Sequence, residues 1–231
     1  MIKTYSMAIH KNVYCSPHTQ VKEMASKDGA NKVLISTELM DKVEALFKEL
    51  RCSKYIIASG YRTSEHDKKV GGDGKGQHTL GTALDGTFYD VTGKIIPAKI
   101  VCCVAQDLGF TGIANINSKH REVHLDVRTG KKWYGDETKG TNTVTSDFYS
   151  YFKVTKEQVA KYTGKSVINY FPKYEGGSVS IIDALKVLGI NSAFTYRTKI
   201  AKANNIKCYV GTGAQNKTML TLLKSGKLVR P

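Results

Sequence analysis

The spacing of apolar residues predicts two helices in the first half of the chain. Over residues 39–50 the apolar positions share one face of a helix of about four turns, with Ser36 or Thr37 as its N-cap. This apolar stripe consists of Leu39, Met40, Val43, Leu46, Phe47 and Leu50. A second helix is expected to open at Pro97, a position that tolerates proline, and to stop at Gly109. We expect both stripes to face the core.

Three short segments have the pattern of strands. Residues 55–60 are an apolar run that ends in glycine, and residues 88–91 form a second short strand before a turn. Residues 120–127 alternate between polar and apolar positions, which places every second side chain on the same face. The polar face carries His120, Glu122, His124 and Asp126. Four ionisable groups on one face argue against an ordinary core strand, because unpaired buried charges are costly, and a solvent-facing edge strand is the alternative.

The last third of the chain contains three further helical patterns. Apolar residues recur at helical spacing over residues 181–188, 194–203 and 219–223. Gly189 and Gly226 are the stop signals after the first and the last of them. These patterns predict a small domain built mostly of helices.

The chain divides at a polar stretch. Residues 133–144 are rich in Gly, Thr, Asp and Asn and lack clear periodicity, which predicts a linker at residues 132–149. Residues 1–131 are then an α+β domain with a small antiparallel sheet and flanking helices. Residues 150–231 are the small, mostly α-helical domain.

The positive charge is concentrated in the second of these parts. The chain of 231 residues has a formal net charge of +15. Residues 150–231 contain 14 Lys and Arg against three Asp and Glu, whereas residues 1–149 contain 21 against 17. The basic part therefore suits a polyanion such as nucleic acid, anionic lipid or an anionic cell-wall polymer. No helix-turn-helix or zinc-finger pattern accompanies the charge, so a nucleic-acid partner is not expected.

Cysteine usage and the N-terminus indicate the compartment of synthesis. The five cysteines are scattered and form no CxxC pair, which indicates reduced thiols rather than a disulfide framework. No apolar run approaches the roughly 18 residues of a membrane span. The N-terminus lacks the apolar region of a secretory signal, so we expect synthesis in the cytoplasm without a signal peptide.

Two histidines and an aspartate have the chemistry of a metal site. His78 and Asp85 are seven residues apart, with a glycine and small residues between them. Together with His124 they supply three zinc ligands and leave a fourth position open for water, as a hydrolytic site requires. Glu122 is then a candidate proton shuttle beside the metal. A single histidine is more often a surface or core residue, so the interpretation depends on the combination.

The order of these motifs resembles a known family. The motifs are Tyr61-Arg62-Thr63, then Gln77-His78 through Gly81, Ala83 and Asp85, and then His124-Leu125-Asp126. Over about residues 20–130 they are similar to the zinc peptidases of peptidoglycan, which include D-Ala-D-Ala carboxypeptidases and the L-alanyl-D-glutamate endopeptidases of phage endolysins. The resemblance implies a zinc peptidase domain within residues 1–131. It also implies that His78, Asp85 and His124 hold one zinc ion per chain.

The resemblance implies substrate contacts as well. The arginine that matches Arg62 binds a substrate carboxylate or stabilises the developing oxyanion. Asp126 either accepts a hydrogen bond from a ligand imidazole or binds the substrate amine. The family usually has a serine where this chain has Gly76, so one hydroxyl contact to the substrate is in doubt.

The general base of the family lies a few residues before the last ligand histidine, at an offset that varies among its branches. Arg121 occupies the position three residues before His124, which some branches fill with an acid. Glu122 is therefore the better candidate for the base, and His120 is the second candidate.

The C-terminal part resembles a module of clostridial and bacillar phage lysins and autolysins. The matching stretches are residues 180–185, 196–201 and 211–216, within a resemblance of about residues 175–231. It implies that this part binds cell walls, where tyrosine rings stack on sugars and Lys and Arg meet the phosphates of teichoic acid.

These patterns together predict an endolysin that acts at the bacterial cell wall. Its zinc peptidase cuts the peptide stem of peptidoglycan, at the L-alanyl-D-glutamate bond, and its basic C-terminal domain holds it on the wall. The expected partners are peptidoglycan and anionic wall polymers; membrane contact through the basic domain and the oligomeric state stay open. The alternatives are a D-Ala-D-Ala carboxypeptidase and a non-catalytic cationic protein that binds walls or membranes.

Overall fold

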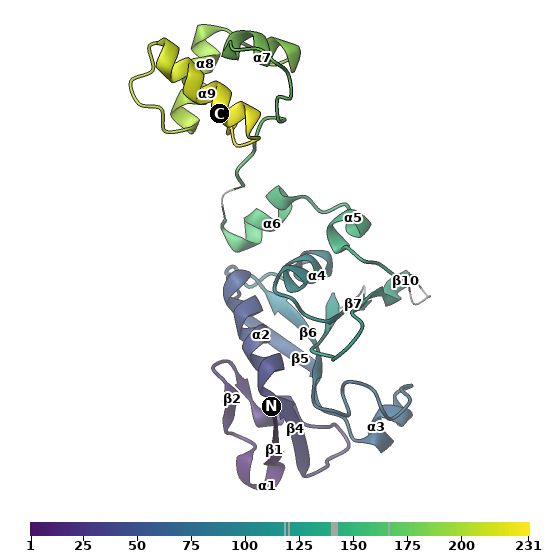
Figure 1. Ribbon diagram of the computed structural model, residues 1–231. Coiled ribbons are helices and arrows are strands. Elements are labelled where there is room, and N and C mark those ends of the chain that lie inside the picture. The colour runs from purple at the N-terminus through teal and green to yellow at the C-terminus, as the bar shows by residue number, and fades with distance from the viewer. Residues whose placement is uncertain (118, 120, 140–142, 166) are drawn as a thin grey trace. The chain divides into compact units, whose positions relative to one another are not determined.

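Contacts divide the chain into two units, Met1–Lys165 and Ser166–Pro231, each with its own hydrophobic core. The computed structural model describes every residue except 118, 120, 140–142 and 166. Figure 1 shows the elements of the two units, which are described separately below.

The described residues of the first unit form ten strands. Their bounds are β1 Ile2–Ser6, β2 Tyr14–Ser16, β3 Thr19–Gln20, β4 Lys32–Ser36, β5 Lys54–Ser59, β6 Ala83–Tyr89, β7 Gly112–Asn117, β8 Glu122–Asp126, β9 Trp133–Asp136 and β10 Thr143–Val144. The helices are α1 Met7–His10, α2 Thr37–Glu49, α3 Ser64–Lys69, α4 Ala98–Asp107, α5 Phe148–Phe152 and α6 Lys156–Thr163, with 3-10 turns η1 Val21–Glu23 and η2 Glu137–Lys139.

Six strands form one sheet in the order β10-β9-β7-β8-β6-β5. Neighbouring strands are antiparallel, except that β9 runs parallel to β7. The first residue of β7, Gly112, pairs with Asp126 at the end of β8 and with Trp133 at the start of β9. The chain therefore leaves β8, crosses the start of β7 and continues beside β7 in the same direction. This pair corrects the expectation of an antiparallel sheet, and the sheet is mixed.

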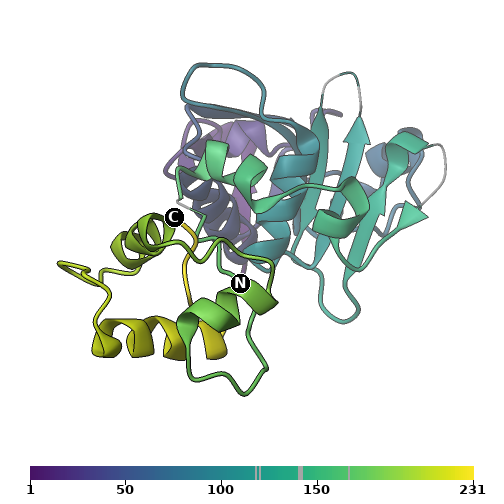
Figure 2. The ribbon, with the colours of Figure 1, turned by 90° about the horizontal axis from the view of Figure 1, so that it is seen from above.

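Helix α4 covers this sheet. It packs on β7 and β8 on one side and on α5 and α6 on the other (Figures 1 and 2). Lys42 of α2 donates from Nζ to the carbonyls of Leu108, at 2.9 Å, and Gly109, at 3.0 Å, where α4 ends. The predicted helices at α2 and α4 are confirmed. Of the two candidate caps of α2, Ser36 is the one used, because its Oγ accepts a hydrogen bond from the amide of Leu39.

The chain after β8 continues the first unit. Tyr134 of β9 and Phe148 of α5 are buried, and their ring centroids lie 5.2 Å apart. The hydroxyl of Tyr134 donates to the carbonyl of Phe110 at 3.2 Å. The units divide after Lys165 and not at the expected linker of residues 132–149. The physical reason is that a few large apolar side chains in this otherwise polar stretch are buried in the core of the first unit.

The second unit consists of three helices in its described residues, α7 Ile181–Val187, α8 Phe194–Ala203 and α9 Gly213–Lys224. They confirm the three helical patterns of the sequence. Its buried apolar side chains include Phe171, Ile181, Leu185, Ile200, Met219 and Leu223. None of the helices in the described part of the chain has the length and apolar content needed to cross a membrane.

Candidate metal centre

His78 lies in the loop between α3 and β6, and its ring is held by a backbone carbonyl that directly follows β5. Its Nδ1 lies 2.7 Å from the carbonyl oxygen of Gly60, and the side chain is buried. A carbonyl oxygen only accepts, so Nδ1 donates and Nε2 is the nitrogen that faces Asp85 and His124. Gly81 shapes this loop, because it has a φ of 70° and a Cβ there would lie 2.4 Å from the carbonyl oxygen of Leu34. The loop therefore directs Nε2 of His78 toward Asp85 and His124.

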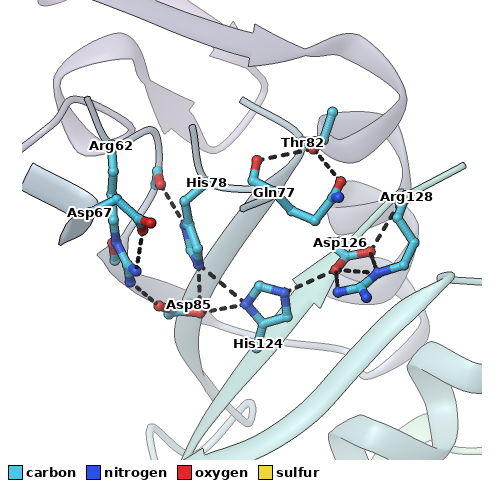
Figure 3. Close-up of polar contacts among 11 residues, drawn as sticks. Arg62, Asp67, Gln77, His78, Thr82, Asp85, His124, Asp126 and Arg128 are labelled. Atoms are coloured by element: carbon cyan, nitrogen blue, oxygen red, sulfur yellow. Dashed lines mark hydrogen bonds and ion pairs between the residues drawn. The ribbon is translucent and has the colours of Figure 1, made fainter. Parts of the chain in front are cut away.

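Asp85 and His124 lie opposite each other on neighbouring strands. Strand β6 starts at Ala83, earlier than the predicted strand at residues 88–91, so Asp85 pairs directly with His124 of β8. Oδ1 of Asp85 and Nδ1 of His124 are 2.9 Å apart. Nε2 of His78 lies 3.2 Å from each of these two atoms (Figure 3). The structure thus brings the three predicted ligand residues together at one point.

These three atoms fit a zinc ion. Their separations are 2.9 to 3.2 Å. Ligand atoms at two corners of a tetrahedron with bonds of about 2.0–2.1 Å are about 3.3 Å apart. Two imidazole nitrogens and one carboxylate oxygen are also a donor set found in catalytic zinc sites. Among the described residues, this is the one group of three or more His, Cys, Asp or Glu side chains placed to hold a metal ion.

Asp126 holds the other nitrogen of His124. Its Oδ2 lies 3.0 Å from Nε2 of His124, and the residue has no exposed surface. The Nε of Arg128 lies 3.0 Å from Oδ1 and 2.9 Å from Oδ2 of the same carboxylate. The first of the two roles expected for Asp126, the hydrogen bond to a ligand imidazole, matches this geometry. The second does not, because a buried carboxylate offers a substrate amine no accessible surface.

Arg62 is paired with the carboxylate of the site. Its Nη2 donates to Oδ2 of Asp85 at 2.7 Å and its Nη1 to Oδ1 of Asp67 at 3.2 Å. Its Nε donates to Oγ of Ser59 at 2.7 Å. The guanidinium therefore orients Asp85 while its remaining N–H groups stay available to a ligand.

A cavity of about 470 Å³ adjoins the three ligand residues. Arg62, Glu122, Trp133 and Glu137 line it together with His78, Asp85 and His124. Oε2 of Glu122 accepts a hydrogen bond from Nδ2 of Asn117 at 3.3 Å. The structure thus places the first candidate base beside the ligands. The second candidate, His120, lies outside the described residues.

Hydrogen bonding sets the charge states of the site. Burial raises the pKa of the Asp85 carboxyl, but hydrogen bonds from His124 and His78 outweigh it and hold this pKa well below its usual range. Burial lowers the pKa of His124, but hydrogen bonds to Asp126 and Asp85 outweigh it and raise the pKa to about 9. The site thus favours a carboxylate and a protonated imidazole, and a cation held by these residues would take the place of that proton.

Sequence reasoning misses four residues of the site: Asp67, Arg128, Trp133 and Glu137. Trp133 and Glu137 fall in the stretch expected to be a linker, although Trp133 is the single tryptophan of the chain. Its ring packs edge to face on the ring of His124, with centroids 6.3 Å apart. The guanidinium carbon of Arg128 lies over the tryptophan ring, 5.2 Å from the ring centroid. Of these four residues, only Trp133 had a feature in the sequence that could have pointed to the site, because it is the single tryptophan.

Comparison with known proteins agrees with this site. Residues 17–126 match the Peptidase M15 family, and that range contains His78, Asp85 and His124. The part of the chain that contains the site is therefore similar to peptidases of the M15 family. A relative is the L-alanyl-D-glutamate peptidase of Listeria phage A118, which is 26% identical over 213 residues. The match spans 85% of this chain and 66% of the phage protein, slightly less than two thirds of its length.

Proposed function

We propose that the protein is a zinc-dependent endolysin that hydrolyses the peptide stem of bacterial peptidoglycan at the L-alanyl-D-glutamate bond. The match to the M15 family and the name of the phage relative support this proposal. The observation that carries it is the convergence of Nε2 of His78, Oδ1 of Asp85 and Nδ1 of His124 beside a cavity that also holds Glu122.

His78, Asp85 and His124 would hold one zinc ion per chain. When bound, zinc supplies Lewis-acid chemistry, which polarises the scissile carbonyl and lowers the pKa of water. The protein contributes the orientation of the ligands. The carbonyl of Gly60 fixes the ring of His78, and Asp126 fixes the ring of His124.

Glu122 is the proposed general base. Asn117 holds one of its carboxylate oxygens, which leaves Oε1 to take a proton from water and to pass it to the leaving amine. The side chain lines the same cavity as the metal ligands, as proton transfer in that cavity requires. His120 remains the second candidate for this role.

Arg62 is proposed to act on the substrate as well as on Asp85. Its guanidinium lines the cavity and is fixed by Asp85 and Asp67. A guanidinium held in this way offers its other N–H groups to the developing oxyanion or to a substrate carboxylate, at little cost in side-chain entropy.

The second unit is proposed to hold the enzyme on the wall. Residues 167–231 contain ten Lys and Arg against two Asp and Glu, a balance that suits the phosphates of anionic wall polymers. Peptidoglycan and these polymers are the proposed partners, with membrane contact through the same cations. The proposed place of action is the bacterial cell wall.

The test is metal content measured together with activity. Purified protein is assayed for zinc and for cleavage of purified peptidoglycan before chelation, after chelation and after zinc is restored, and mass spectrometry identifies the fragments. We expect about one zinc per chain and cleavage that is lost and regained with it. Fragments with a new N-terminal D-glutamate would support cleavage at the L-alanyl-D-glutamate bond. Release of free D-alanine would instead show that the enzyme is a D-Ala-D-Ala carboxypeptidase. Absence of both zinc and cleavage would overturn the proposal.

A further inference from the structure

A second cavity, of about 530 Å³, lies on the first unit and shares one lining residue, Asn117, with the cavity at the metal centre. Its walls come from the start of α4, from β7, from η2 and from the end of α5. Four of the residues that line it are cationic, namely Lys99, Arg121, Lys139 and Lys153. We call it the basic pocket.

The charge of the basic pocket is not neutralised from within. Among the described residues, none of these four cations takes part in an ion pair. The one carboxylate in the lining, Asp136, is buried and bonded through both oxygens. Oδ1 accepts from the amide of Thr138 at 3.1 Å and its hydroxyl at 2.6 Å, and Oδ2 accepts from the hydroxyl of Tyr151 at 3.1 Å. The pocket thus presents a surplus of positive charge.

The start of α4 adds to this charge. Its N-cap is Pro97, and no side chain caps the helix. The first backbone N–H groups of a helix have no partner within it, and the helix dipole places partial positive charge there. Pro97, Ala98 and Lys99 all line the pocket. Lysine charge and the helix terminus therefore favour the same kind of ligand, an anion.

The basic pocket and the metal cavity share a boundary. Asn117 lines both of them. Within η2, Glu137 lines the metal cavity, whereas Thr138 and Lys139 line the basic pocket. A peptide that runs from the metal centre past Asn117 and η2 would therefore reach the basic pocket.

We propose that the basic pocket binds the C-terminal carboxylate of the peptidoglycan peptide stem while the scissile bond lies at the metal centre. This inference rests on the proposed function. The shared boundary favours a group of the same substrate molecule over a separate phosphate polymer. A carboxylate accepts hydrogen bonds from ammonium and guanidinium groups at both oxygens, which suits several convergent cations.

The experiment measures binding without turnover. Full-length protein freed of zinc by chelation is titrated calorimetrically with L-Ala-γ-D-Glu-L-Lys-D-Ala, as the free acid and as the C-terminal carboxamide. The pocket variant combines Lys99→Gln and Lys153→Gln, which remove charge and keep side-chain length. The matched control combines Lys27→Gln and Lys48→Gln, two exposed lysines outside both cavities. Thermal unfolding checks that the variants fold.

We expect the pocket variant to raise the Kd of the free acid about tenfold and the control to leave it unchanged. The carboxamide should bind weakly and equally to all three proteins. Equal Kd values for acid and carboxamide on the wild type, or an unchanged Kd for the pocket variant, would overturn the inference. A teichoic-acid fragment that alone loses affinity in the pocket variant would assign the pocket to phosphate instead.

Cleavage of peptidoglycan by the zinc-loaded wild type is measured in parallel. Cleavage with equal Kd values for acid and carboxamide counts against the pocket alone. If the Kd values of the free acid and the carboxamide differ clearly but no cleavage is seen, only the proposed hydrolysis is contradicted. The two proposals can therefore fail separately.

Discussion

Nε2 of His124 lies 3.0 Å from Oδ2 of Asp126, a carboxylate without exposed surface. Since a carboxylate accepts, Nε2 donates and Nδ1 is the nitrogen left to face Asp85 and His78. Arg128 donates to both oxygens of Asp126 and so fixes the carboxylate itself. Contacts of this kind set the tautomer and the ring orientation of a metal-ligand histidine.

Asp126→Asn should weaken zinc binding by about 10- to 100-fold, the typical effect of changing a group that orients a metal ligand. The amide keeps the size of the side chain but loses the charge that fixes His124. Affinity is measured by competition with a chromophoric chelator, and thermal unfolding checks the fold. Asp41→Asn, at an exposed position of α2, is the matched control and should leave the affinity unchanged. Equal affinities for the two variants would contradict the orienting role of Asp126.

Gly112 makes room for the same carboxylate. A Cβ at this position would lie 2.0 Å from Oδ2 of Asp126, closer than any nonbonded contact allows. Gly112→Ala should therefore displace Asp126, lower the zinc affinity and destabilise the protein by about 1–3 kcal/mol, the usual cost of overpacking. Urea unfolding and chelator competition measure the two effects. Gly177→Ala, where a Cβ meets nothing within 4 Å, should change neither, and a tolerated Gly112→Ala would show that Asp126 is free to move.

The sequence is sufficient to predict which three residues come together at the candidate metal centre, and most helices. His78, Asp85 and His124 belong to ordered motifs, and the structure places them together. The helices at α2, α4, α7, α8 and α9 follow from apolar periodicity with caps or stop residues nearby. In both cases the information is local, within a motif or within a few turns of helix.

The stretch expected to be a linker shows where local information ends. Residues 133–144 are polar on average, yet Gly135 and Asp136 of β9 are buried because β9 pairs with β7 and β10. The composition of two distant segments does not predict whether they pair as strands. The contact between Arg62 and Asp67 was missed for a related reason, since it depends on where α3 is placed.

Truncation tests where the first unit ends. A chain of residues 1–131 lacks β9, α5 and α6 and should fail to fold, because it removes Tyr134 and Phe148 from the core. Replacing one buried phenylalanine by alanine alone costs about 3–5 kcal/mol. A chain of residues 1–165 is the control and should unfold cooperatively and bind zinc. Circular dichroism melting curves compare the two. Cooperative melting of the shorter chain would show that the first folded unit ends near residue 131, as the sequence predicted.

Asp147 links α5 to α4. Its carboxylate accepts from Nε2 of Gln106 at 2.8 Å and from the amide of Ser150 at 3.0 Å, as the N-cap of α5. Asp147→Ala should lower the free energy of unfolding by about 1 kcal/mol at pH 7. Hydrogen bonds from Gln106 and Ser150 hold the pKa of Asp147 at about 2, below its ordinary value.

The stabilisation by ionised Asp147 is therefore complete above pH 4 and is lost as the pH falls toward 2. Urea unfolding of the wild type and of Asp147→Ala between pH 2 and 7 measures this difference. We expect the two stabilities to converge at the acid end. A difference that stays constant with pH would show that the carboxylate charge contributes nothing.

Glu122→Gln separates catalysis from metal binding. Loss of a general base typically lowers the rate by 10²- to 10⁴-fold, and we expect that loss in kcat on a soluble muropeptide. Zinc content should stay at the wild-type level, because Glu122 is not among the three ligand residues. Glu65→Gln, at an exposed position of α3, is the control for a lost carboxylate and should keep full activity. Glu137→Gln is the comparison within the same cavity. Activity that survives Glu122→Gln but is lost in Glu137→Gln would identify Glu137 of η2, and not Glu122 of β8, as the general base.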